Sequence, residues 1–296
     1  MPRTALAAMR TVALVVLVAL VAACAIVGGD PNAPRLRAQA DAALARWADA
    51  VAASGGAVFV PVGKLTGQIG DWEAANGDNK VALMSGAVQA ATALSTDPPP
   101  DGQVRWPNGT SATLPLMSAA QALEAIGTGG AQPCSECRPI RVTGARLTSG
   151  AFETSRGQAT VPLWAFTIEG SAVQITRVAI ASQVAPVIPP WDPEHAPVGI
   201  SVDKAALSSD GLTLTVSFVG APNPANQPCG EDYTGLAVES DLAVVAIVLV
   251  QRNLTLGGCA AVGALRTAEL RLAKPLGERT VLEVQEGRPV AVTPEP

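Results

Sequence analysis

The chain has 296 residues, enough for two domains of ordinary size, and 48% of them are hydrophobic, which excludes a disordered chain. Charged residues make up only 15% and the formal net charge is -5, a balance that argues against nucleic acid as a partner. Aromatic residues make up 3%, which disfavours stacking platforms for sugars or bases. Lysine occurs only at Lys64, Lys80, Lys204 and Lys274.

Residues 1–23 have the pattern of a bacterial export signal. Arg3 and Arg10 precede an almost unbroken apolar run over residues 11–20, and small residues lead up to Cys24. Residues 21–24, Val-Ala-Ala-Cys, resemble a lipobox, in which the chain is cut before the cysteine and a diacylglyceryl group is attached to its sulfur. We expect acyl chains of the palmitate type on Cys24 to hold the protein on the extracytoplasmic face of the cell membrane, because two chains anchor stably and one binds marginally.

Two alternatives for this segment stay open. An uncleaved transmembrane helix would need about 20 apolar residues, and residues 12–27 fall short of that length. A plain signal peptide would leave Cys24 as an incidental residue. In the lipoprotein interpretation, residues 24–34 form a short tether whose end is rich in Gly, Pro and Asn.

Five cysteines are present, an odd number that would leave one thiol unpaired in an exported protein. With lipid on Cys24, the other four can pair in an oxidising compartment, and we predict the disulfides Cys134–Cys137 and Cys229–Cys259. The second would stabilise the fold by about 3.5 kcal/mol in the chain-entropy model. A redox site would need a helix after the Cys-x-x-Cys motif, and a zinc site would need a second close pair; the residues after Cys137 favour a strand instead.

An α+β module is expected over residues 35–130. A helix is predicted over residues 34–53, because apolar residues recur at helical spacing, Pro34 suits the first turn and glycines follow. Turn signals such as Asn108-Gly109 separate short predicted strands, which cover residues 57–62, 65–69, 80–84, 87–94, 103–106 and 110–116. Ser118 and Gln121 predict a capped helix, and the Gly-rich residues 128–132 predict a domain boundary.

Residues 131–296 are expected to form a larger antiparallel module resembling a β-sandwich. Glu169-Gly170-Ser171 predicts a tight hairpin, and the proline-rich residues 184–197 predict an irregular connection. The aliphatic run over residues 242–250 is too short to span a bilayer and predicts a strand buried on both faces. Residues 266–272 alternate between polar and apolar, as in a half-buried strand.

No catalytic, metal or cofactor site is predicted. His195 is the only histidine, so a Ser-His or Cys-His mechanism would need it, but its proline-rich loop favours a hydrated, non-catalytic side chain. The scarcity of histidine also disfavours a catalytic zinc site. The candidates for a carboxylate pair are Asp71, Glu73, Glu231 and Asp232, which lie beside turns or cysteines, although no pattern singles out two of them. The sequence contains no glycine motif for binding nucleotide phosphates.

Three stretches of the C-terminal half carry a resemblance to known sequences. They are Thr-Ser-Arg-Gly at 154–157 leading to Val-Pro-Leu-Trp-Ala-Phe at 161–166, Cys-Gly-Glu-Asp-Tyr at 229–233, and Pro-Leu-Gly-Glu-Arg at 275–279 with Gly-Arg-Pro-Val at 287–290. The chain resembles uncharacterised secreted lipoproteins of actinobacteria in these stretches. The resemblance implies an extracytoplasmic address and no particular activity.

The sequence therefore predicts a mainly β protein: an N-terminal lipid-anchored helix and small α+β module, followed by a larger antiparallel β-sandwich-like module. The leading hypothesis is a non-enzymatic binding or structural role on the outer face of the membrane, with an unknown envelope protein or ligand as partner. The alternative is an envelope hydrolase that uses carboxylates no motif identifies. A cavity lined by convergent acids would favour the hydrolase, and a shallow apolar patch would favour the binding role.

Overall fold

The computed structural model describes residues 30–56, 59–73, 77–130, 134, 136–185, 188–253 and 259–295. The predicted leader, Cys24 and most of the tether lie outside the described residues. Of the described residues, 39% are in strands and 16% in helices, and the strands form three mostly antiparallel sheets, which confirms the mainly β class. No helix in the described part of the chain is long and apolar enough to cross a membrane.

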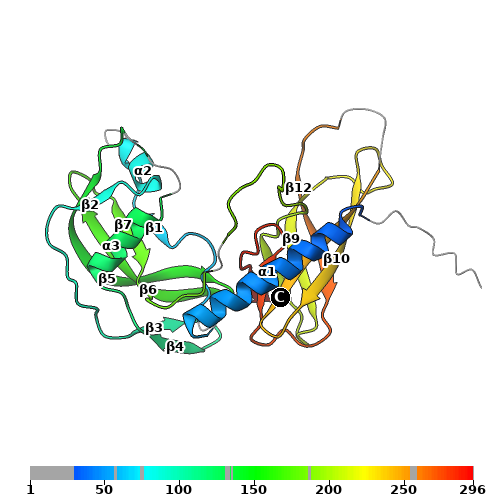
Figure 1. The fold of residues 1–296 in the computed structure, drawn as a ribbon, viewed down its shortest axis with the longest axis horizontal. Helices are drawn as coiled ribbons and strands as arrows, with labels where there is room; N and C mark the ends of the chain where they lie inside the picture. The colour runs from blue at the N-terminus through cyan, green and yellow to red at the C-terminus, as the bar shows by residue number, and fades with distance from the viewer. Residues whose placement is uncertain are drawn as a thin grey trace, which may run out of the picture.

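Helix α1 (Ala33–Ser54) is the first element and packs on the C-terminal half of the chain. It has proline in its first turn and ends at Gly55, whose φ of 74° lies in the left-handed region that glycine adopts readily. Its apolar stripe, predicted from the sequence, is buried at Leu36, Ala40, Ala43, Trp47 and Val51. Figure 1 shows this helix, in blue, lying along the strands of the C-terminal module.

The first module follows α1 and contains one seven-stranded sheet with two helices. Strand β6 pairs with β5 along one edge and with β7 and β3 along the other, β1 and β4 are the outer neighbours, and β2 lies parallel to β5. Helix α3 packs on this sheet and contributes Ala122, Leu123 and Ile126 to the core. The elements are β1 (Thr66–Ile69), α2 (Gly77–Met84), β2 (Val88–Ala90), β3 (Gly102–Arg105), β4 (Ser111–Leu114), α3 (Ala119–Thr128), β5 (Ile140–Thr154), β6 (Gly157–Ile168) and β7 (Gln174–Val178).

Local sequence signals in this module are mostly confirmed. Ser118 and Gln121 form the predicted capping box, with both side-chain hydrogen bonds to backbone present. The Asn108-Gly109 turn joins β3 to β4 as an antiparallel hairpin. The strand predicted over residues 80–84 is wrong, because these residues end helix α2. Five mostly apolar residues fit a buried helix segment as well as a strand, and periodicity alone does not separate the two.

The sheet crosses the boundary that we predicted near residue 130. Strands β5, β6 and β7 follow that position in the sequence, yet they pair with the strands that precede it. They do so because side chains such as Val161 and Phe166 of β6 bury themselves in the core that α3 covers. The chain passes to the second module through the proline-rich residues after β7, within 184–197. The Gly-rich stretch after α3 is thus a connection inside the first module.

The second module contains two sheets that face each other across a second core. One sheet has the order β10-β11-β13 and the other β12-β9-β8-β14. Alternate residues of β11 face opposite ways: Val244, Ala246 and Val248 enter the core between the sheets, whereas Ala243, Val245 and Ile247 pack against α1. The predicted strand with two buried faces is confirmed, with α1 covering the second face. The elements are β8 (Lys204–Leu207), β9 (Thr213–Gly220), β10 (Glu231–Glu239), β11 (Ala243–Arg252), β12 (Ala264–Arg271), β13 (Thr280–Glu283) and β14 (Ala291–Pro294).

Candidate functional site

The candidate functional site is a cavity in the first module. It lies between the segment that leads into β1, β1 itself, α2, the C-terminal end of α3 and β7. Its volume is about 450 Å³, within the range of roughly 300–1,000 Å³ that is typical of small-molecule sites. The lining side chains that matter most for its chemistry are Lys64, Trp72, Lys80, Leu83, Met84 and Arg177.

The cavity wall carries positive charge without any negative charge. Lys64, Lys80 and Arg177 line it, and among the described residues no Asp, Glu or His does. None of these three cations forms an ion pair within the described part of the chain. The whole chain has 25 acidic and 20 basic residues, so the wall reverses the sign of the protein's net charge.

Arg177 is the most constrained of the three cations. It lies on β7 directly opposite Thr66 of β1, and its Nη1 donates a hydrogen bond of 3.0 Å to the Thr66 hydroxyl. Partial burial alone lowers the pKa of Arg177 from its usual value, which agrees with the lack of a nearby carboxylate. A guanidinium that is partly out of water and has no anionic partner is energetically unfavourable, so it favours an incoming anion.

Two buried donors of the lining residues lack an acceptor in the described part of the chain. Arg177 Nε and Trp72 Nε1 are shielded from solvent, and neither has a hydrogen-bond partner among the described residues. A buried donor left unpaired costs about 1–3 kcal/mol. Two buried donors beside the cavity are therefore left without an acceptor in the described part of the chain.

Apolar side chains form a further part of the cavity wall, beside Thr66, Gln68 and three glycines. Leu83 and Ile126 come from α2 and α3 and are largely buried, whereas Met84 lines the cavity with 59% of its surface exposed. Val81 lies one helical turn before Met84 and is 53% exposed, so α2 presents two adjacent apolar side chains to solvent. Exposed apolar groups beside a cationic wall suit a ligand with both polar and apolar parts.

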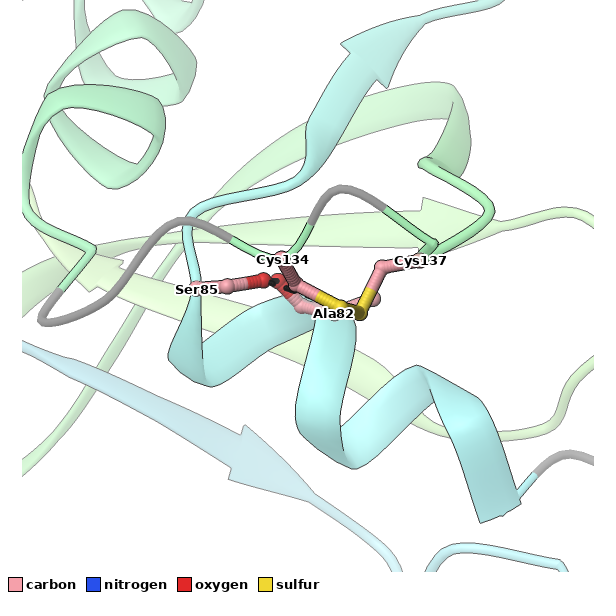
Figure 2. Close-up of a disulfide and its surroundings, with 4 residues drawn as sticks. All are labelled: Ala82, Ser85, Cys134 and Cys137. Atoms are coloured by element: carbon pink, nitrogen blue, oxygen red, sulfur yellow. Dashed lines mark hydrogen bonds between the residues drawn. A yellow bond between two sulfur atoms is a disulfide. The ribbon is translucent and has the colours of Figure 1, made fainter.

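The first predicted disulfide lies beside helix α2, next to this cavity. Cys134 and Cys137 are joined, and the bond lies at the C-terminal end of α2 beside Ala82 and Ser85 (Figure 2). Ser85 Oγ donates to the Ala82 carbonyl oxygen at 3.0 Å and lies 4.0 Å from Cys137 Sγ. No helix follows Cys137, and β5 begins at Ile140, so the disulfide holds the start of a strand as the sequence suggested.

The backbone after α3 also lies in close contact with the end of α2. The backbone of Gly130 approaches the end of α2 so closely that a Cβ atom there would lie 2.2 Å from the Ser85 carbonyl oxygen. Only glycine fits this contact between the ends of α2 and α3. The end of the helix that supplies Lys80, Leu83 and Met84 is therefore in contact with both Cys137 and Gly130.

The second predicted disulfide, Cys229–Cys259, lies in the other module and is also present. Beside it, the Tyr233 hydroxyl donates to Glu231 at 2.7 Å and accepts from the Ala221 backbone N–H at 2.5 Å. Burial, and then the hydrogen bond to Glu231, raises the pKa of Tyr233 to about 12. These bonds tie the start of β10 to the end of β9.

The four candidate carboxylates do not converge on one site. Glu73 accepts hydrogen bonds from Ser171 Oγ and the Ala172 N–H, at the turn between β6 and β7. Glu231 pairs with Arg252 at 2.7 Å, and Asp232 accepts from a backbone N–H in the second module. Asp71 is exposed and, like Glu73, belongs to the first module. The structure therefore divides the four between two modules, and it gives Glu73, Glu231 and Asp232 structural hydrogen bonds.

His195 lines a different cavity, of about 460 Å³, between α1 and residues 188–197. Its side chain is 80% exposed, and Nδ1 lies 2.7 Å from Asp192 Oδ2. That hydrogen bond is the main cause of the lowered pKa of Asp192. The other acid here, Glu286, pairs with Arg288. Within the described residues, no hydroxyl or thiol hydrogen-bonds to the ring, and a non-catalytic His195 stays our prediction.

The three C-terminal stretches singled out in the sequence include side chains with structural contacts. Trp164 Nε1 donates to the Met117 carbonyl oxygen at 2.9 Å. Arg279 is 5% exposed and pairs with Glu239 at 2.6 Å, which fixes the loop before β13. None of these stretches lines the cationic cavity as far as the structure describes it. Trp164 and Arg279 therefore have structural hydrogen bonds.

The sequence did not reveal the cationic cavity. Its charged side chains come from segments far apart in the chain, and only the pairing of β1 with β7 brings Arg177 beside Thr66. The one available signal was the rarity of lysine, since two of the four lysines line this cavity. The described residues contain no group of three or more His, Cys, Asp or Glu side chains that could hold a metal ion.

A comparison of the chain with protein-family models, with curated proteins and with solved structures finds no match. Its function is therefore argued from its own geometry.

Proposed function

We propose that this chain is a lipid-anchored binding protein of the bacterial cell envelope, and that its ligand binds unchanged in the cavity of the first module. Two disulfides support an oxidising, extracytoplasmic location. The basic and apolar leader and Cys24 support the anchor. In this proposal the protein's contact with the membrane is the lipid on Cys24.

The arrangement of the N-terminal segment fits a cavity held away from the membrane. Asp30 accepts a hydrogen bond of 3.1 Å from the backbone N–H of Val250, near the end of β11. The six residues from Cys24 to residue 29 span at most about 20 Å, so the anchor would lie close to the second module, whose facing sheets form the sandwich-like body. Helix α1, with 22 residues and a length of about 33 Å, then leads to the first module.

The composition of the cavity wall is the observation that carries the proposal. Cations and apolar side chains line the cavity, and the described lining contains no carboxylate, imidazole or thiol to act as general base or nucleophile. Such a wall can bind and orient a ligand, whereas the groups that most often convert one lie elsewhere in the fold. The carboxylates proposed for a hydrolase are divided between the two modules and do not support that alternative.

Native mass spectrometry of the full chain in detergent tests this proposal. After incubation with an extract of bacterial envelope, we expect the parent protein to retain a non-covalent ligand whose mass stays constant over time. Met84→Trp, which fills the cavity, should lose that ligand, while Val219→Trp, at an exposed site of the second module, should keep it. A parent without adduct, or a ligand whose mass changes with time, would contradict the proposal.

A further inference from the structure

The chemistry of the cavity wall specifies the kind of ligand that it fits. We infer that the cavity binds an anionic amphiphile, in which an oxyanion head group is joined to a short aliphatic chain. This inference rests on the proposed function and adds the class of ligand to it. It depends on two independent features, the unpaired cations and the apolar wall.

The three cations line one cavity, where each can attract an oxyanion. Lys64 precedes β1, Lys80 lies on α2 and Arg177 lies on β7, so three separate segments bring positive charge to the same space. Thr66 occupies Nη1 of Arg177, and Nη2 has no hydrogen-bond partner in the part of the chain that the structure describes. A guanidinium can donate two parallel hydrogen bonds to a carboxylate or phosphate, and the two ammonium groups add attraction that salt weakens.

The like charges also exclude other head groups. Without a ligand, three cations share one wall and no described carboxylate offsets them. The attraction of an oxyanion to the three cations offsets the repulsion among them. A neutral head group leaves that repulsion unchanged, and a cationic head group increases it. Selectivity for the sign of the head-group charge is therefore the strongest consequence of the wall.

The apolar wall requires more than a free anion. Leu83, Met84 and Ile126 line the same cavity, and Met84 exposes 59% of its surface. Inorganic phosphate would leave the exposed surface of Met84 in contact with water. An aliphatic chain would cover that surface, and each methylene that it buries raises the affinity roughly fourfold.

Isothermal titration calorimetry of the full chain with five probes below their micelle concentrations tests the inference. The probes are decanoate, decyl phosphate, decanol, decyltrimethylammonium and inorganic phosphate. We expect at least one anionic amphiphile to bind about tenfold or more tightly than decanol, and to bind more tightly than phosphate alone. Preference for decyl phosphate or for decanoate identifies the head group as a lipid phosphate or a fatty acid, and either result supports the inference.

Failure of the inference is distinguishable from failure of the proposed function. Equal affinity for decanol or decyltrimethylammonium would overturn the anion selectivity while leaving a binding cavity. No binding of either anionic amphiphile would also overturn it, and the envelope-extract experiment would then decide separately whether the cavity binds anything.

Charge-removing variants locate the binding. Removal of both exposed lysines in Lys64→Gln/Lys80→Gln should weaken binding of the anionic probe about fivefold to twentyfold and leave decanol unaffected. Arg177→Gln should weaken binding of the anionic probe about tenfold to a hundredfold, but this substitution also removes a hydrogen bond between β1 and β7.

The double lysine variant removes charge without removing a hydrogen bond between strands, so it separates the effect of charge on binding from an effect on folding. Its matched control is Lys204→Gln, at an exposed lysine of β8. A double variant that binds as tightly as Lys204→Gln would refute the assignment.

Discussion

Trp47 provides a direct test of the packing of α1 on the second module. Its side chain is fully buried against a cluster that includes Val245 and Ile247 of β11. Trp47→Ala removes the largest side chain of that cluster, and core substitutions of this size cost about 3–5 kcal/mol. This is a large part of the roughly 5–15 kcal/mol that stabilises a typical domain. We expect the second module of this variant to unfold at a markedly lower urea concentration.

Trp47→Phe refines the test, because Trp47 Nε1 is buried without a hydrogen-bond partner in the described part of the chain. Phenylalanine loses some of the buried ring but also removes an unpaired donor that costs about 1–3 kcal/mol. The two effects oppose each other, so we expect Trp47→Phe to cost less than about 2 kcal/mol.

Urea unfolding followed by far-UV circular dichroism measures both variants. Arg37→Ala, at an exposed position of the same helix, is the control and should stay within about 0.5 kcal/mol of the parent. If Trp47→Ala unfolds within about 1 kcal/mol of that control, α1 is not part of the core of the second module and the reasoning fails.

Three further predictions concern other parts of the chain. Cys24→Ser should release the protein from the membrane fraction or block its maturation, and metabolic lipid labelling as strong as in the parent would contradict the anchor. Replacing Cys229 and Cys259 by alanine should lower the free energy of unfolding by about 3.5 kcal/mol, measured against the oxidised parent, and an unchanged urea midpoint would contradict this. Tyr233 is the only tyrosine, so absorbance at 295 nm should show its phenolate forming only near pH 12, because burial and Glu231 raise its pKa to about 12. The raised pKa means that its contribution to stability is complete below pH 10 and is lost as the pH rises from about 10 to 12; ionisation with the ordinary midpoint near 10 would rule out this environment.

Features that depend on local sequence were predicted well. The stripe of α1 follows from helical spacing, and the Ser118–Gln121 capping box follows from two residues three positions apart. The strand over residues 242–250 was recognised because it is aliphatic throughout, although the sequence did not show that α1 covers one of its faces. Both disulfides were predicted because four cysteines remain after Cys24, two of them in a Cys-x-x-Cys motif that leaves Cys229 and Cys259 for each other.

Features that depend on pairing across the chain were not predicted. Nothing in the residues of β6 shows that its partners include both β3 and β7, so the boundary between the modules was placed too early. The cavity was missed for the same reason, because only the fold brings Lys80 and Arg177 to the wall of one cavity. A short apolar run such as residues 80–84 fits a helix and a strand equally well, and tertiary packing decides between them.

The indole N–H signals in the NMR spectrum of the full chain locate the ligand most directly. The chain has five tryptophans, of which Trp72 lines the cationic cavity and Trp191 lines the cavity beside α1. Single Trp→Phe variants assign the five signals, and decyl phosphate is then titrated into the parent protein. If the cavity of the first module is the binding site, the Trp72 signal moves and saturates while the Trp191 signal stays in place. Movement of Trp191 with Trp72 unchanged, or no movement of any indole signal, would contradict a binding site in this cavity.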